Sequence, residues 1–139
     1  MEIKKILVPI DSSAYSRDAA ERAKSLAGFY GSEIILLNAI DISNIYQFDL
    51  PENIRAEYYR LSTELLQTFK QNLDAAGYRV TTVQREGVPY DVIIGYAEEA
   101  DIDLIVMGSQ GTSGVTSFLL GSVTRKVAIG SHKSVLIVR

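Results

Sequence analysis

The chain alternates between short apolar segments and longer amphipathic segments along its whole length. Segments of β-branched and aliphatic residues at 3–10, 33–40, 79–85, 103–107 and 134–138 are typical of buried strands. The segments between them, at residues 12–30, 51–76, 89–100 and 122–129, have glycine or proline at or next to their ends and are predicted helices. This alternation predicts βαβ units, and therefore an α/β, Rossmann-like fold: an open five-stranded parallel sheet with helices on both faces. We expect residues 1–139 to form one domain.

The second predicted helix is long and amphipathic. Its apolar positions recur at helical spacing and predict a buried stripe that faces the sheet. The predicted stripe consists of Ile54, Tyr58, Leu61, Leu65, Phe69, Leu73 and Ala76.

A glycine-rich segment directly follows the fourth predicted strand. Gly108, Gly111, Gly121 and Ser122 read G-x2-G-x9-G-S, and the last pair opens a predicted helix. Backbone N–H groups and the helix dipole at such a place can hold phosphate, and glycine both lacks a side chain and can take positive φ. The segment is neither a Walker loop nor a G-x-G-x-x-G dinucleotide fingerprint. The alternative is a surface loop whose glycines only make turns.

Polar or backbone groups also follow the first two predicted strands. Asp11 comes where the first strand gives way to a helix, and its carboxylate can accept hydrogen bonds from a base or a sugar. Alternatively, Asp11 caps that helix together with Ser12 and Ser13. Ala39, near the end of the second strand, can offer only its backbone. If the first and fourth strands are neighbours, the loops that follow them diverge and leave a crevice for a ligand.

Composition excludes several classes of function. The net charge of −3 and pI near 5.1 argue against non-specific binding to nucleic acid. Without cysteine, and with His132 as the only histidine, disulfides and zinc sites of the usual kind are excluded. The chain has no signal-peptide pattern and no apolar stretch long enough to span a bilayer, so we expect no membrane association and a cytoplasmic location.

Taken together, these residues resemble the universal stress protein family, in its ATP-binding branch. The resemblance covers the whole chain and includes G-x2-G-x9-G-[ST], which marks that branch and is matched in full. The further matching segments are Lys5-Ile6-Leu7-Val8-Pro9-Ile10-Asp11-Ser12-Ser13, Gly87-Val88-Pro89, Asp103-Leu104-Ile105-Val106-Met107-Gly108-Ser109, Leu119-Leu120-Gly121-Ser122-Val123 and Val135-Leu136-Ile137-Val138.

The resemblance implies a fold of the adenine nucleotide alpha hydrolase type, with ATP in the crevice. Asp11 would bond to the adenine or ribose, Pro9 would shape the turn beside it, and the Ala39 backbone would contact the adenine edge. Met107 and Gly108 would lie under the ribose and first phosphate. N–H groups of Gly111, Gly121, Ser122 and Val123, with the Ser122 hydroxyl, would bind the phosphates, and the phosphates would hold most of any Mg²⁺.

The resemblance also implies a homodimer paired through the last strand, Val135 to Val138. An exposed apolar edge there would otherwise be a liability. Two departures from the family pattern stand out. Gln110 and Thr112 occupy loop positions where many relatives have a basic residue, so backbone dipoles would carry most of the phosphate affinity. Lys133-Ser134 replaces a frequent Cys-Pro before the last strand.

The leading functional hypothesis is therefore a dimeric, nucleotide-binding regulatory module. A slow ATP hydrolase is less favoured, because no phosphate-loop lysine, second acidic strand end or positioned base is evident. A nucleotide-free dimeric interaction scaffold is a further alternative. A phosphorelay receiver fits poorly, because Asp11 stands alone and the chain stops at Arg139. Arg125 is interpreted as a solvated or ion-paired residue rather than a phosphate ligand.

Overall fold

The computed structural model describes residues 2–42, 50–112 and 119–139, and it confirms the predicted alternation of strands and helices. The strands are β1 (Lys5–Pro9), β2 (Glu33–Ile40), β3 (Val80–Glu86), β4 (Leu104–Gly108) and β5 (Ser134–Val138). The helices are α1 (Ala14–Tyr30), α2 (Glu52–Ala75), α3 (Pro89–Glu99) and α4 (Ser122–Gly130). None of the helices in the described ranges is long and apolar enough to cross a membrane.

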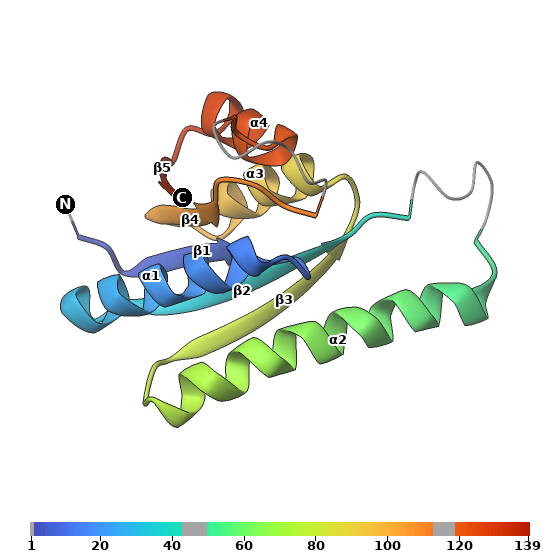
Figure 1. Cartoon of the computed structure of the whole chain (residues 1–139), viewed down its shortest axis with the longest axis horizontal. Coiled ribbons are helices and arrows are strands. Elements are labelled where there is room, and N and C mark those ends of the chain that lie inside the picture. The colour runs from blue at the N-terminus through green and yellow to red at the C-terminus, as the bar shows by residue number, and fades with distance from the viewer. Residues whose placement is uncertain (1, 43–49, 113–118) are drawn as a thin grey trace.

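All the strand pairs are parallel, and the strands are ordered β3-β2-β1-β4-β5 (Figure 1). Strand β1 is therefore central, and the first and fourth strands are neighbours. The chain winds outward from β1 to β3 and then returns to place β4 on the other side of β1. The strand order reverses between β1 and β4, which is where open α/β sheets bind ligands.

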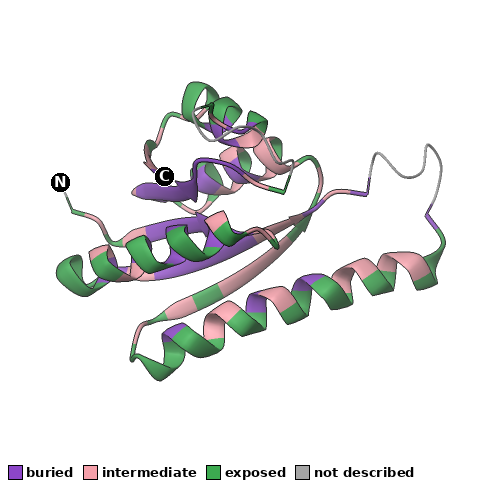
Figure 2. Ribbon diagram, viewed as in Figure 1, coloured by how far each residue is buried: buried purple, intermediate pink, exposed green. Residues whose placement is uncertain are grey.

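The sheet separates two hydrophobic clusters because side chains alternate between its faces. Ile6 and Val8 pack with α1 and α2 on one face, while Leu7 packs with α3 and α4 on the other. Strands β1 and β4 are buried along most of their length, and the outer surfaces of the helices are exposed (Figure 2). A central parallel strand covered on both faces reads as a continuous apolar run, which explains why β1 and β4 are so clear in the sequence.

The predicted stripe of α2 is partly wrong. The buried residues of the helix are Ser62, Leu66 and Leu73, whereas Leu61 is 49% exposed. Ala76 is exposed and follows the last helical residue. The helix packs on the edge strand β3 and on β2, and its buried residues lie partly outside the predicted stripe. Of the predicted stripe, Leu65 and Phe69 pack against the core, and Leu61 and Leu65 line a cavity.

Candidate functional site

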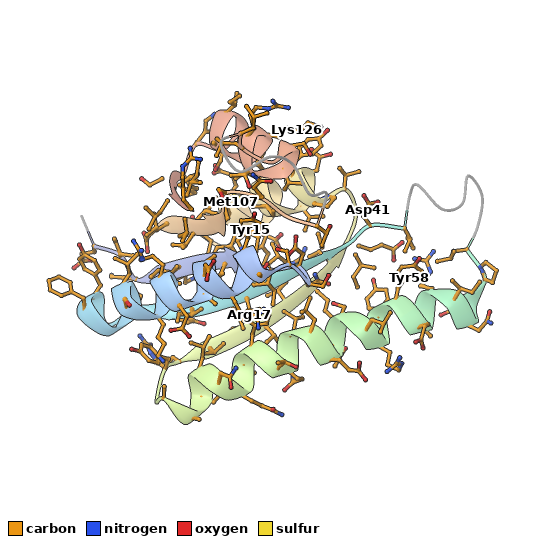
Figure 3. The ribbon with its side chains drawn as sticks, in the orientation of Figure 1. Tyr15, Arg17, Asp41, Tyr58, Met107 and Lys126 are labelled. Carbon is orange, nitrogen blue, oxygen red and sulfur yellow. The ribbon has the colours of Figure 1, made fainter. Side chains whose placement is uncertain are left out.

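A cavity of about 720 Å³ lies at the carboxyl edge of the sheet, where α2, α3 and the start of α4 rise around the ends of β1, β2 and β4. Its lining includes all of the predicted site residues: Pro9, Asp11, Ala39, Met107, Gly108, Gly111, Gly121, Ser122 and Val123. Figure 3 locates Met107 on the β4 side of the sheet and Tyr58, another lining residue, on α2. The fold thus brings the predicted residues together, and their role toward a ligand stays a prediction.

The Asp11 carboxylate is held in place by the start of α1. Its Oδ1 accepts hydrogen bonds from Ser13 N at 2.8 Å, Ser13 Oγ at 2.5 Å and Ser16 Oγ at 2.9 Å. The alternative that Asp11 caps α1 together with Ser12 and Ser13 is not confirmed, because the N-cap is Ser13 without a side-chain cap bond and Asp11 Oδ1 instead fixes the turn before the helix. The other oxygen, Oδ2, lies beside the glycine loop, since a Cβ added at Gly111 would be 2.8 Å from it. The hydrogen bonds to Oδ1 orient the carboxylate, and Oδ2 remains beside the cavity.

At the loop glycines, the missing side chain lets other parts of the protein approach the backbone closely. Unusual backbone angles are not the reason for glycine there. A Cβ at Gly108 would lie 2.6 Å from Tyr15 Cβ, and one at Gly121 would lie 3.1 Å from Gln110 Cα. Neither these glycines nor Gly111 have positive φ, so the expectation that the loop exploits positive φ is wrong for the described glycines. Residues 113–118, in the middle of the predicted G-x2-G-x9-G-S pattern, lie outside the described ranges.

Helix α4 presents its N-terminus to the cavity. Gly121 is the N-cap, and the first bond of the helix runs from Arg125 N to Gly121 O at 2.9 Å. The N–H groups of Ser122, Val123 and Thr124 precede that bond and have no carbonyl partner within the helix. Thr124 Oγ1 donates to Gly108 O at 2.8 Å, which ties the helix start to the end of β4. The arrangement gives the cavity a fixed cluster of N–H groups at the positive end of a helix dipole.

The backbone of Ala39 faces the crevice. The bond from Ile10 N to Leu37 O, at 2.8 Å, joins the chain just beyond β1 to β2. Backbone bonding along a central parallel strand alternates between its two neighbours, and Gly87 N donates to Ile40 O on the β3 side at 3.0 Å. Ala39 therefore directs its N–H and C=O toward the β1 side, beyond the point where β1 has ended. These groups form a donor–acceptor pair on a cavity-lining residue.

Charge is distributed unevenly around the cavity. Asp11 and Asp41 line it, and its described lining includes no lysine or arginine. Any anion must therefore be held by N–H groups and hydroxyls, in agreement with the absence of a basic residue at Gln110 and Thr112. Over the same described ranges, no group of three or more His, Cys, Asp or Glu side chains is arranged to hold a metal ion.

The first turns of helix α2 are attached to the sheet by Glu86, the last residue of β3. Arg55 pairs with Glu86, and Tyr59 Oη donates to Glu86 Oε2 at 3.2 Å. The hydrogen bond from Arg55 lowers the pKa of Glu86, while burial and the neighbouring Glu86 carboxylate raise the pKa of Tyr59. This cluster positions the first turns of α2, from which Tyr58 reaches the cavity.

Sequence reasoning missed one wall of the cavity and several of its polar groups. Besides Tyr58, the wall is formed by Leu61, Ser62 and Leu65 of α2, which the sequence did not indicate, and the missed polar groups include Asn38 and Thr124. Thr124 stands two residues after the Gly-Ser pair, which is a usable signal. Ser62 has no signal, because a serine in an amphipathic helix is normally solvent-facing. His132, with a 91% exposed side chain beside Glu98, and Arg125 do not line the cavity.

Known proteins are similar to this chain in both sequence and fold. A model of the universal stress protein family matches residues 2–139. Universal stress protein MJ0531 of Methanocaldococcus jannaschii is 33% identical over 139 residues, which cover 98% of this chain and 82% of that protein. The solved structure of MJ0577, a universal stress protein of the same organism, is 31% identical with a TM-score of 0.90, and the match covers 99% of this chain and 96% of that one.

A universal stress protein solved in complex with cAMP is also similar. It is 27% identical, with a TM-score of 0.78, and the match covers 100% of this chain and 99% of that one. The match of the family model to nearly every residue, together with relatives above 30% identity that align over most of their own length, shows that the chain belongs to the universal stress protein family.

Proposed function

We propose that this protein is a cytoplasmic ATP-binding regulatory module that holds the nucleotide in the cavity at the carboxyl edge of the sheet. One observation carries the proposal: the Asp11 carboxylate, the outward backbone of Ala39 and the N-terminus of α4 all open on the same cavity. A base-binding edge and an anion-binding end are thus separated by a carboxylate that can accept hydrogen bonds from a ribose. A nucleotide carries complementary groups in that order.

Each end of the nucleotide has a partner of suitable chemistry. The N–H and C=O of Ala39 suit the acceptor and donor atoms on the edge of adenine. The N–H groups of Gly111, Gly121, Ser122 and Val123, with the Ser122 hydroxyl, suit phosphate oxygens. Met107 and Gly108 would lie beneath the ribose and first phosphate, and Pro9 would set the turn that leads to Asp11. Any Mg²⁺ would be held mainly by the phosphates. The similar structure solved with cAMP supports an adenine nucleotide as the ligand class.

The purified protein is expected to bind ATP at about one molecule per chain. Titration calorimetry with ATP, AMP and adenosine measures this directly, and mass spectrometry of the denatured protein identifies any nucleotide that copurifies. ATP should bind more tightly than adenosine, because adenosine has no phosphate to bind at the N-terminus of α4. A protein that binds none of these ligands would contradict the proposal. Phosphate release that stays linear over many turnovers and depends on Asp11 would replace it with slow ATP hydrolysis.

We also propose that two copies pair through β5. The strand is the sheet edge next to β4, and its sequence Val135-Leu136-Ile137-Val138 is apolar. Ser109 N donates to Val138 O at 2.8 Å, so Val138 bonds toward β4 and Ile137 directs its N–H and C=O to the open side. An apolar edge with unpaired backbone groups is a template for strand pairing, and a second copy would cover it.

The substitution Ile137→Pro is expected to convert the dimer into a folded monomer. Proline removes the outward N–H of Ile137 but leaves the bonds between β4 and β5, and proline is tolerated on edge strands. Sedimentation equilibrium at micromolar concentration should give the mass of two chains for the unchanged protein and of one chain for the variant. Circular dichroism checks that the variant is folded. A monomeric unchanged protein, or a dimeric folded variant, would refute pairing through this edge.

A further inference from the structure

Ser62 is an exception among the hydroxyl-bearing residues of α2. Serine and threonine in a helix commonly donate to the carbonyl four residues earlier, as Thr63 does to Tyr59 O and Thr68 does to Glu64 O, both at 2.9 Å. Ser62 is only 4% exposed, and its Oγ has no hydrogen-bond partner among the described residues. A buried polar atom without a partner destabilises the fold that contains it, so its presence requires an explanation.

The residue that carries the unpartnered hydroxyl, Ser62, lines the wall of the cavity formed by α2. Ser62 lines the cavity between Leu61 and Leu65. Asn38 lines it from β2, and by strand alternation it shares the sheet face of the core residue Leu36, which is the face that α2 covers. The Asn38 Nδ2 donates to Ile10 O at 2.8 Å, which leaves its carbonyl oxygen as the remaining polar atom of that side chain. The α2 side of the cavity therefore combines leucines with uncharged polar groups from Ser62, Asn38 and Tyr58.

This side of the cavity lies away from the glycine loop. Helix α2 packs on β2 and β3, whereas β4 and α4, which flank the glycine loop, lie on the other side of β1 (Figure 1). Asn38 is adjacent in sequence to Ala39, whose backbone faces the crevice. The charged residue nearest to this stretch of β2 in sequence is the cavity-lining Asp41, which disfavours a phosphate here. The ligand group that fits is uncharged, flat enough to lie against leucines and able to hydrogen-bond.

We propose that Ser62 is a ligand-contacting residue whose hydroxyl bonds to the purine base of the nucleotide, in a subsite completed by Asn38, Leu61 and Leu65. The proposal rests on the proposed function, because it assigns one end of the same ligand. Base binding gives the buried hydroxyl its missing partner and covers the half-exposed side chain of Leu61. Ser62 is thereby a determinant of base recognition that acts independently of the phosphate loop.

The test is Ser62→Ala, measured by calorimetry with ATP and with adenosine. Loss of one neutral hydrogen bond is expected to weaken both ligands by the same factor, about 3- to 10-fold. An equal loss places the contact on the part of the ligand that both share. Weaker binding of ATP with unchanged binding of adenosine would place the hydroxyl near the phosphates and overturn the assignment.

The melting temperature of the ligand-free protein is a second readout, and Ser62→Ala is expected to change it in the opposite direction to ligand affinity. Because Ser62 has no partner without a ligand, Ser62→Ala is expected to raise the melting temperature by about 2–5 °C while lowering affinity. A fall in melting temperature would mean that the hydroxyl has a structural partner, and it would overturn the proposal. Thr68→Ala is the matched control, because it removes a hydroxyl from the same helix outside the cavity and is expected to leave affinity unchanged.

The two proposals can fail separately. If the unchanged protein binds ATP and Ser62→Ala binds it equally well, the assignment of Ser62 is wrong and nucleotide binding stands. If the unchanged protein binds neither ATP nor adenosine, both are wrong.

Discussion

Gly121→Val is expected to weaken ATP binding by about 100-fold or more while the chain stays folded. A Cβ at this position would already lie 3.1 Å from Gln110 Cα and 3.5 Å from Ser109 O, and both are backbone atoms. Gly121 N also donates to Ser109 O at 2.8 Å, so the two arms of the loop are in direct contact. A branched side chain must push them apart and displace the N-terminus of α4.

The size of the effect follows from the bonds that the displacement would remove. A hydrogen bond to a charged group contributes about 1.5–3 kcal/mol. Loss of two such bonds from α4 N–H groups to phosphate costs at least about 3 kcal/mol, which corresponds to roughly 100-fold in affinity. Adenosine has no phosphate, so its affinity should change far less. Calorimetry with both ligands measures the difference.

Gly95→Val is the matched control for this experiment. Gly95 lies in α3 with nothing within 4 Å of an added Cβ, and it does not line the cavity. The same chemical change there is expected to leave ATP affinity unaltered. Retention of full ATP binding by Gly121→Val would show that the start of α4 does not hold the phosphates. Equal losses for ATP and adenosine would indicate a general disturbance of the cavity instead.

The alternation of strands and helices is readable from sequence because the sheet is buried on both faces. Ile6, Leu7 and Val8 are all fully buried although they face opposite sides, and so they form a run without helical period. The position of Asp11 beside the glycine loop is also predictable. Both follow strands, and parallel strands end at one edge of a sheet. The sequence does not determine that β1 and β4 are neighbours. The strand order of the structure shows that they are.

The errors concern details that depend on packing between distant segments. By spacing, Leu61 belongs to an apolar stripe, but its exposure depends on how α2 packs on β2 and β3. Ser62 is buried for the same reason. The role of the loop glycines was misjudged in part because spacing does not reveal what lies opposite each glycine. For Gly108 the opposing atoms belong to Tyr15, far away in sequence.

The close contact between Gly108 and Tyr15 leads to the largest expected effect on stability. Gly108→Ala is expected to lower the free energy of unfolding by about 3 kcal/mol and the melting temperature by about 10 °C. The new Cβ would lie 2.6 Å from Tyr15 Cβ and 2.9 Å from Tyr15 O, so α1 or β4 must move. Both elements are central to the fold, because α1 packs on β1 and β4 and Gly108 O accepts the bond from Thr124 Oγ1.

Gly95→Ala gives the contrasting result for the same one-methyl change. Its added Cβ would meet open space on an exposed helical position, so the higher helix propensity of alanine is expected to stabilise the protein by up to about 1 kcal/mol. Urea unfolding of both variants, followed by circular dichroism, measures the two changes on one scale. If Gly108→Ala were as stable as the unchanged protein, the close contact between α1 and the end of β4 would be wrong. The placement of Asp11 beside the glycine loop depends on that contact, so it would have to be reconsidered as well.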